Sequence, residues 1–289
     1  SELYGYDYPW QKYSQVTVRD YVSGAMENTT GVIFGEFMQG TERELIDEKN
    51  NERIVAHELV HHWFGDLVTC ESWANLPLNE AFANYGEYLW IEHKYGKDEA
   101  DFHLFNEMQG YLYTSDENLH DLIDYDYTNR EDMFDAHSYN KGGAILHMLR
   151  NYVGDEAFFT SLKLYLKRFK FKSAEAHDLR LIFEEVTGED LNWFCNQWFF
   201  SKGHPQLSVS YEYDSSTQQA ILEVEQIQNP DYHNAIYQLP LKIDIYTGSE
   251  VISENIFINQ RQQRFHFNVK QKPVLMNLDA DKILVGRIT

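Results

Sequence analysis

The stretch VAHELVHHWFGDLVTCESWANLPLNEAFANYGEY, residues 55–88, decides the fold of the first part of the chain. Its apolar residues recur every three or four positions, which is typical of a helix with one buried face. Within it, HELVH places His57 and His61 one helical turn apart, so both imidazoles project from the same face. Two imidazoles arranged in this way can bind Zn²⁺, which takes nitrogen ligands at about 2.0–2.1 Å.

Two glutamates complete the pattern of a catalytic metal site. Glu58 follows His57 and points to one side of the same face, where a carboxylate can accept a proton from water. A catalytic zinc ion needs a third protein ligand, and Glu80 stands near the start of the next predicted helix. Each signal alone has a simpler explanation. HExxH can occur by chance, and Glu80 can be an exposed acid at the start of a helix. Together they predict one zinc ion per chain on His57, His61 and Glu80.

The composition excludes several classes of protein. The formal net charge is -22, which argues against nucleic-acid binding and against docking on an anionic membrane. No apolar run reaches the roughly 18–20 residues of a membrane span. We expect Cys70 and Cys195 to be reduced thiols. The chain lacks a signal peptide and an initiator Met, so we expect Ser1 to follow a cut. Cytoplasmic and periplasmic or secreted locations both stay open.

The hydrophobic pattern predicts an α+β protein with a change of character near residue 204. Apolar spacing and turn signals predict short strands at 16–18 and 32–34, followed by a helix from Asp47 that stops at Gly65. Further helices are expected at about 78–95, 98–113, 139–152, 155–169, 174–186 and 190–200. Beyond Pro205 polar and apolar residues alternate, which predicts a small antiparallel β-sandwich.

Three motifs in order resemble one known family. GAMEN at residues 24–28, the pair HELVH and LNEAFANYGEYLW, and SYNKGG at residues 138–143 are similar to the signatures of the gluzincin aminopeptidases, the family of aminopeptidase N and leukotriene hydrolase. The resemblance covers residues 1–203 and implies a thermolysin-like, mainly helical zinc-peptidase catalytic domain. Residues 204–289 resemble the small β-domain that follows it in many members.

The resemblance implies a role for each motif. The GAMEN residues are expected to bind substrate: Gly24, Ala25, Met26, Glu27 and Asn28. Glu27 would bind the free α-amino group, because a carboxylate distinguishes a cationic amine from a peptide nitrogen. Gly24 and Ala25 would lie on an extended edge, where backbone groups pair with a peptide. Without the family, Glu27 would be an ordinary loop acid.

Two further side chains acquire roles in the same way. Tyr139 would donate its hydroxyl to the oxyanion that develops in the transition state, although a tyrosine-rich chain offers packing as the simpler explanation. Glu87, seven residues after Glu80 on the same helix face, would orient a ligand histidine. His62 lies off that face and is expected to be a packing or supporting residue. Asn79, Asn84 and Trp73 are interpreted as structural.

The resemblance therefore predicts an aminopeptidase acting on peptides with a free N-terminus. Family members usually carry an N-terminal β-domain and often a C-terminal helical domain, so we expect this chain to be part of a larger enzyme and the amino-end pocket to be incomplete. Phe134 stands where leukotriene hydrolase has a tyrosine, so epoxide hydrolysis is not expected. Two alternatives remain, a thermolysin-type endopeptidase without amino-group selectivity and a non-catalytic peptide-binding relative.

Overall fold

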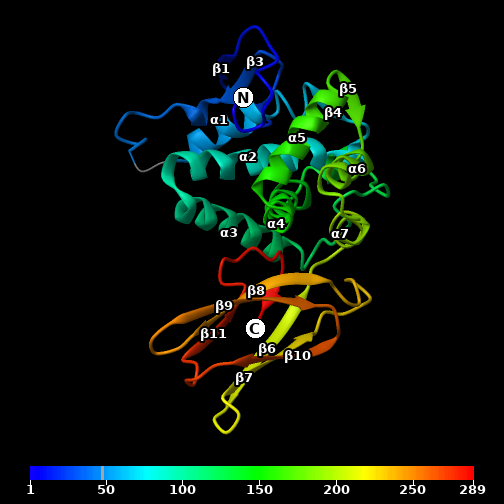
Figure 1. Ribbon diagram of the computed structural model, residues 1–289. Helices are drawn as coiled ribbons and strands as arrows, with labels where there is room; N and C mark the ends of the chain where they lie inside the picture. Colours follow the sequence, from blue (N-terminus) through cyan, green and yellow to red (C-terminus); the bar gives the residue numbers. More distant parts are fainter. Residues whose placement is uncertain (47–48) are drawn as a thin grey trace. The chain divides into compact units, whose positions relative to one another are not determined.

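The computed structural model describes residues 1–46 and 49–289, and these form two compact units (Figure 1). The first unit comprises residues 1–111 and 122–191, and the second comprises residues 112–121 and 192–289. The domain boundary expected near residue 204 stays a prediction. Position 47, where the sequence predicts the first helix to begin, lies outside the described residues.

A small sheet opens the first unit. It contains β1 (Ser14–Val18), β2 (Ala25–Met26) and β3 (Gly31–Gly35) in the order β1-β3-β2, followed by the short helix η1 (Glu36–Met38). The buried side chains of Val32 and Phe34 anchor the central strand. β2 runs antiparallel to β3 and forms one edge of the sheet. An edge strand presents unpaired backbone groups to a partner.

Helices make up most of the rest of this unit. They are α1 (Asn50–Val60), α2 (Pro77–Tyr95), α3 (Lys97–Thr114), α4 (Gly142–Val153), α5 (Asp155–Phe169) and α6 (Ala176–Thr187), with short helical turns η2 (Trp73–Asn75) and η3 (Arg130–Met133) and a π-helical turn η4 (His137–Lys141). Two of the predicted helix boundaries differ by three or more residues. The first helix ends at Val60, before Gly65, because the chain turns back there to begin a strand. Regular α-helix begins at Gly142, because Tyr139 lies in the π-helical turn.

The α2 helix is the centre of the first unit. Every residue from Pro77 to Gly86 is buried, and the helix packs against both α1 and α4. Its close approach to α1 depends on Gly86, where an added Cβ would lie 2.5 Å from Cγ2 of Val60. Two helices can come this close only where one side chain is absent, and this contact sets the spacing between the helices.

One pairing joins distant parts of the first unit. β4 (Val68–Cys70) runs parallel to β5 (Lys172–Ala174). The sequence pattern places residues 172–173 between two predicted helices, and they do separate α5 from α6, but it does not indicate that both belong to β5. Asn79 accepts a hydrogen bond from the backbone N–H of Cys70 at 3.1 Å, which ties the pair to α2.

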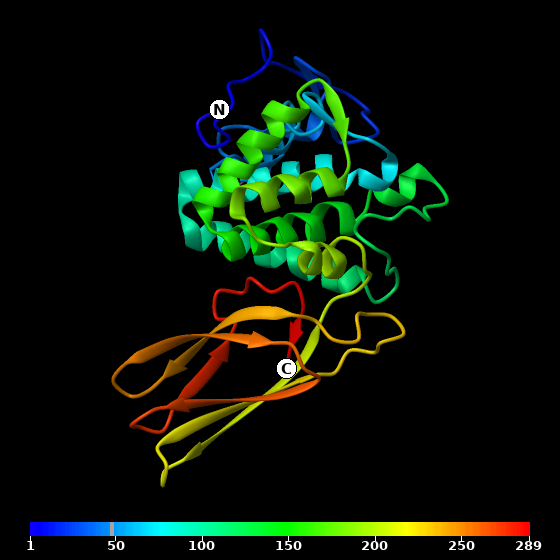
Figure 2. The same cartoon turned by 45° about the vertical axis from the view of Figure 1, so that its right-hand side comes forward.

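The second unit contains one short helix and two sheets. Its elements are α7 (Asn192–Trp198), β6 (Gln206–Asp214), β7 (Gln219–Gln226), β8 (Leu239–Tyr246), β9 (Val251–Ile258), β10 (Gln262–Asn268), β11 (Leu275–Leu278) and β12 (Arg287–Ile288). The sheet orders are β10-β7-β6-β12 and β11-β8-β9, and Figure 2 shows the two layers. Alternate residues of β7 are buried, as in a sheet with one face in a core.

The predicted α+β class is confirmed, with one correction to the strand directions. β12 pairs with β6 in parallel, so the sandwich is not wholly antiparallel. β12 has only two residues, too few for an alternation of polar and apolar side chains to reveal the strand or its direction. Among the described residues, the helices all lack the combination of length and apolar character that crossing a membrane requires.

Candidate active site

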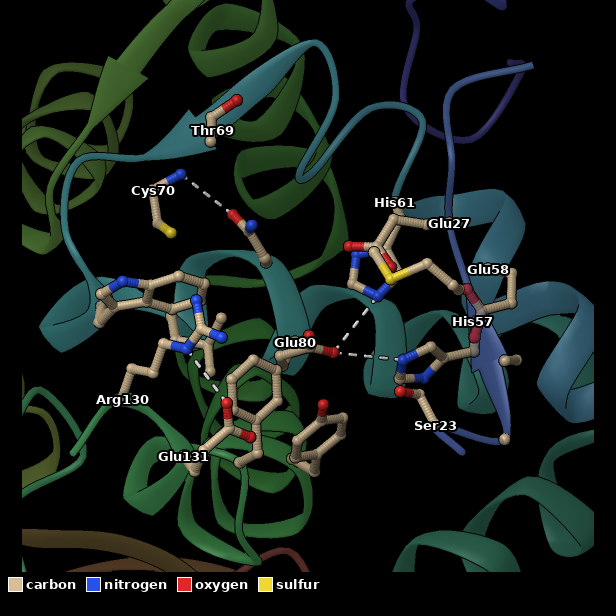
Figure 3. A pocket seen from close by; sticks show the side chains of 18 of the residues that line it. Ser23, Glu27, His57, Glu58, His61, Thr69, Cys70, Glu80, Arg130 and Glu131 are labelled. Carbon is tan, nitrogen blue, oxygen red and sulfur yellow. Dashed lines mark hydrogen bonds and ion pairs between the residues drawn. The ribbon is translucent and has the colours of Figure 1, made fainter. Parts of the chain in front are cut away.

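His57 and His61 meet one carboxylate oxygen. Oε2 of Glu80 lies 3.3 Å from Nε2 of His57 and 3.2 Å from Nε2 of His61, and dashed lines in Figure 3 join the carboxylate to both rings. The donor atoms of these side chains lie within 4.8 Å of one another. The side chains of His57, Glu80 and His61 are 12%, 6% and 2% exposed. Two imidazole nitrogens and a carboxylate form a donor set that suits zinc.

The other nitrogen of each ring is already engaged. Nδ1 of His57 lies 3.0 Å from Oε1 of Glu87, and Nδ1 of His61 lies 3.0 Å from the backbone carbonyl of Phe64. Both partners are acceptors, so each Nδ1 carries a proton and Nε2 is the ring nitrogen that faces the centre. Such outer contacts fix the tautomer of a metal-binding histidine. The residues present therefore fit a metal ion.

The carboxylate of Glu80 and the two imidazoles shift one another's pKa values. Burial lowers the pKa of His61, but the carboxylate of Glu80 raises it to about 9. Burial likewise opposes the charged form of Glu80, yet the imidazoles of His61 and His57 hold its pKa well below the usual range. A carboxylate that stays ionised while buried is suited to bind a cation.

Glu58 faces the cleft beside this centre. Burial raises the pKa of its carboxyl to about 7, against the opposing effect of His61 and His57. Its Oε2 atom is buried and has no hydrogen-bond partner among the described residues. A side-chain oxygen left unpaired in a buried position costs free energy unless water or a ligand meets it. Glu58 is therefore placed to accept a proton from a molecule bound in the cleft.

The ring of Tyr139 stacks on the ring of His57. The two rings stack with centroids 5.9 Å apart and an angle of 10° between their planes. Burial and the carboxylate of Glu80 raise the pKa of the Tyr139 phenol, so the hydroxyl keeps its proton. It is carried by η4, and π-helical turns are frequent at functional sites.

The GAMEN segment contains the edge strand of the small sheet, β2, which comprises Ala25 and Met26. Gly24, Ala25, Met26 and Glu27 line the cleft, together with His57, Glu58, His61 and Glu80. Gly24 has a φ of 76°, and its carbonyl accepts a hydrogen bond from Gly35 at 2.7 Å, which aligns the strand. Asn28 is not among the cleft-lining residues; its carbonyl closes the turn to Gly31 at 2.8 Å.

The cleft has a volume of about 1090 Å³ and is strongly acidic. Beyond the residues already named, Glu71 and Glu131 contribute carboxylates, and Arg130 contributes a guanidinium. Figure 3 shows Glu27 and Glu58 on one side of the Glu80 carboxylate and Arg130 on the other. Trp73, interpreted from the sequence as structural, also lines this cleft and is 40% exposed.

Several supporting residues extend the site. His62 is fully buried; its Nδ1 donates to the carbonyl of Glu58 at 3.1 Å, and its Nε2 accepts from the N–H of Thr30 at 3.3 Å. It thereby fastens the turn after GAMEN to the end of α1. Sequence reasoning missed Arg53 and His103, which contact Glu87. It also missed Glu107, which accepts hydrogen bonds from Asn84 and Asn140. The four-residue spacing of His103 and Glu107 on α3 is the one signal that indicates a shared polar face.

Comparison with known proteins identifies the family. Residues 1–198 match the model described as the Peptidase family M1 domain. The chain belongs to peptidase family M1. This membership agrees with the resemblance carried by GAMEN, HELVH and SYNKGG.

The chain is similar in sequence to aminopeptidases from distant organisms. Aminopeptidase M1-A of Oryza sativa subsp. japonica is 33% identical over 279 residues, which cover 92% of this chain and 30% of that protein. Puromycin-sensitive aminopeptidase of Caenorhabditis elegans is 28% identical over 277 residues, which cover 92% of this chain and 29% of that protein. The chain thus spans about 30% of the length of these relatives.

A solved structure shares the fold. Aminopeptidase A of Legionella pneumophila, in a complex with aspartic acid, matches 100% of this chain and 33% of that chain with a TM-score of 0.82. The sequence identity of 21% makes this a likeness of fold.

Proposed function

We propose that this chain carries the reaction centre of a zinc-dependent aminopeptidase, which hydrolyses the first peptide bond of a peptide with a free N-terminus. The observation that supports this most is the meeting of two Nε2 atoms and one Glu80 oxygen in a cleft edged by Glu27. Membership of the M1 family supports it independently.

Zinc is the proposed cofactor. His57, His61 and Glu80 would hold it, because their donor atoms converge and the remaining ring nitrogens are held by Glu87 and Phe64. When bound, the ion supplies a Lewis acid that polarises a carbonyl group and increases the acidity of water.

The remaining steps belong to side chains of this chain. Glu58 accepts a proton from the attacking water and later returns it to the leaving amine, as a general base and then a general acid. Tyr139 donates its hydroxyl hydrogen bond to the carbonyl oxygen as that atom gains negative charge. Glu27, at the end of the edge strand, binds the α-ammonium group and so restricts cleavage to the first bond.

Paired substrates test this proposal. We would measure hydrolysis of an amino-acid arylamide with a free amino group and of its N-acetylated twin, for the zinc-loaded chain and for Glu27→Ala and Glu58→Ala. Turnover of the free amine alone, lost in both variants, is the expected result. Glu185→Ala, an exposed acid paired with Arg168, is the control that should keep activity.

The opposite results point to the two alternatives. Cleavage of the acetylated twin at a comparable rate would identify an endopeptidase. Absence of turnover for both substrates, with one zinc ion bound per chain, would point to a non-catalytic role or to a site that other domains of the polypeptide complete. Repeating the assay on a longer polypeptide separates these two.

A further inference from the structure

A partly buried carboxylate, that of Glu107, joins four segments of the first unit. Glu107, on α3, uses one oxygen to accept hydrogen bonds from two side-chain amides, Nδ2 of Asn84 at 3.1 Å and Nδ2 of Asn140 at 2.6 Å. Its other oxygen lies 3.8 Å from Nη1 of Arg53 on α1. Hydrogen bonds to an ionised oxygen are about twice as strong as neutral ones. Glu107 therefore holds α1, α2 and η4 to α3.

One arm of this network ends beside Tyr139. Asn140 is the next residue along η4, so the bond to Glu107 fixes the turn that carries the phenol. The two glycines that follow allow the chain after this turn to lie close to α2. An added Cβ on Gly142 would lie 2.6 Å from Cβ of Ala81, and one on Gly143 would collide with Oδ1 of Asn84. The turn is thus held on one side by α3 and on the other by α2.

The other arm ends at His57. Arg53 lies 3.6 Å from Oε2 of Glu87, whose other oxygen contacts Nδ1 of His57. The same guanidinium lies 2.9 Å from Nδ1 of His103, and Nε2 of His103 lies 3.6 Å from Glu87. Arginine can only donate, so Nδ1 of His103 accepts and its Nε2 carries the proton. Glu107 thereby connects the histidine side of the site with the tyrosine side.

We propose that Glu107 and Asn140 act as positioning residues for Tyr139, holding its hydroxyl at the point where the reacting carbonyl oxygen gains charge. This role rests on the proposed function of Tyr139. A hydrogen-bond donor accelerates a reaction only when it is held in place before the charge develops. The hydrogen bond from Asn140 to Glu107 supplies such a restraint at the residue next to Tyr139.

A double-mutant cycle tests the proposal. We would compare Asn140→Leu, Tyr139→Phe and the double variant, with arylamide turnover, bound zinc and melting temperature as readouts. Asn140→Leu removes a bond to a charged acceptor, so we expect kcat to fall about tenfold. KM and zinc content should stay within about twofold of the wild-type values. In the Tyr139→Phe background the same change should lower kcat by less than about twofold, since the hydroxyl it positions is gone.

Three further variants separate positioning from folding. Glu107→Gln keeps an oxygen that both amides can use and should retain more activity than Glu107→Leu. Asn151→Leu is the matched control, because Asn151 donates to the carbonyl of His147 within α4 and should leave kcat unchanged. Independently of activity, hydrogen exchange of residues 137–143 should become about tenfold faster in Asn140→Leu, while residues 155–169 keep their rates.

Each contrary outcome has a distinct meaning. Unchanged kcat in Asn140→Leu would overturn the positioning role. So would a double variant whose loss in kcat equals the product of the two single losses. Unchanged hydrogen exchange in residues 137–143 would also overturn it, including in a chain that shows no turnover. Wild-type activity in Tyr139→Phe would instead overturn the proposed function of Tyr139.

Discussion

Oε1 of Glu87 lies 3.0 Å from Nδ1 of His57, on the opposite side of the ring from Glu80. Both glutamates belong to α2 and are separated by two helical turns, so one rigid helix presents a candidate ligand and a ring-orienting group together. The geometry of the site is therefore set mainly by how α1 packs on α2.

Removal of the Glu87 carboxylate should weaken metal binding. In Glu87→Ala the His57 ring loses the acceptor for its Nδ1 proton, so the orientation of Nε2 is no longer fixed. We expect zinc affinity, measured by competition with a chromophoric chelator, to fall by about 10–100-fold. Glu92→Ala, five residues further along α2 and paired with Arg150, should leave the affinity unchanged. Equal affinities in the two variants would show that Glu87 does not orient the ring.

Widening the contact between α1 and α2 should disturb stability and metal affinity together. Gly86→Ala introduces a Cβ against Val60, and such overpacking costs about 1–3 kcal/mol. The melting temperature and the zinc affinity should both decrease. Val60→Ala removes the nearest methyl groups, so the double variant should lose less than the sum of the single changes. Strict additivity of the two losses would exclude this contact as the cause.

A stability measurement can distinguish residues that bind zinc from Glu58, the proposed general base. An ion that binds the folded chain raises its stability by about 2.7 kcal/mol at a hundred times the dissociation constant. His61→Ala should lose this stabilisation. Glu58→Gln should keep it while kcat falls by about 10²–10⁴-fold, because the general base is gone and the ligands remain. Loss of the stabilisation in Glu58→Gln would place Glu58 among the ligands.

Acid should destabilise the first unit through a buried histidine. Nδ1 of His147 lies 3.1 Å from the hydroxyl of Tyr85, and burial lowers the pKa of His147 to about 4. In the unfolded chain the histidine pKa is about 6.5, so the unfolded state binds the proton first as the pH falls. Stability contributed by neutral His147 is complete above about pH 6.5 and is lost progressively toward pH 4.

Denaturant unfolding at pH 7.5 and pH 5 measures this effect. His147→Gln cannot take up a proton, so the loss of stability between these pH values should be smaller than in the wild type. The exposed side chain of His93 gives the matched control, and His93→Gln should keep the wild-type difference. An identical pH dependence in all three proteins would show that His147 does not contribute.

The parts of the site that lie on one helix could be predicted from the sequence. The spacing of His57 and His61, and of Glu80 and Glu87, fixes which side chains share a face whatever surrounds the helix. GAMEN and SYNKGG added residues that no periodicity indicates. The network around Glu107 could not be predicted, because Arg53, Asn84 and Asn140 come from three different elements. Their meeting depends on helix packing, which hydrophobic spacing does not specify.

The fold shows the same division. The α5 helix runs over Asp155–Phe169, as the pattern predicts, because it has a clear apolar face and glycine before it. β5 was missed, since three residues that include Lys172 and Ser173 form a strand only by pairing with β4. The π-helical turn at Tyr139 was read as ordinary helix, because local propensity does not distinguish the two.

The pairing of β4 with β5 has a consequence for a chain during its synthesis. Asn75, just before α2, accepts a hydrogen bond from the N–H of Ala176, 101 positions later. Contacts so far apart in sequence form late, and the segments between them wait in a partly ordered state. A nascent chain that has emerged only as far as α5 already contains both histidines and Glu80. It lacks the strand that holds β4, so its metal-binding geometry is expected to become native only after residue 176 has left the ribosome.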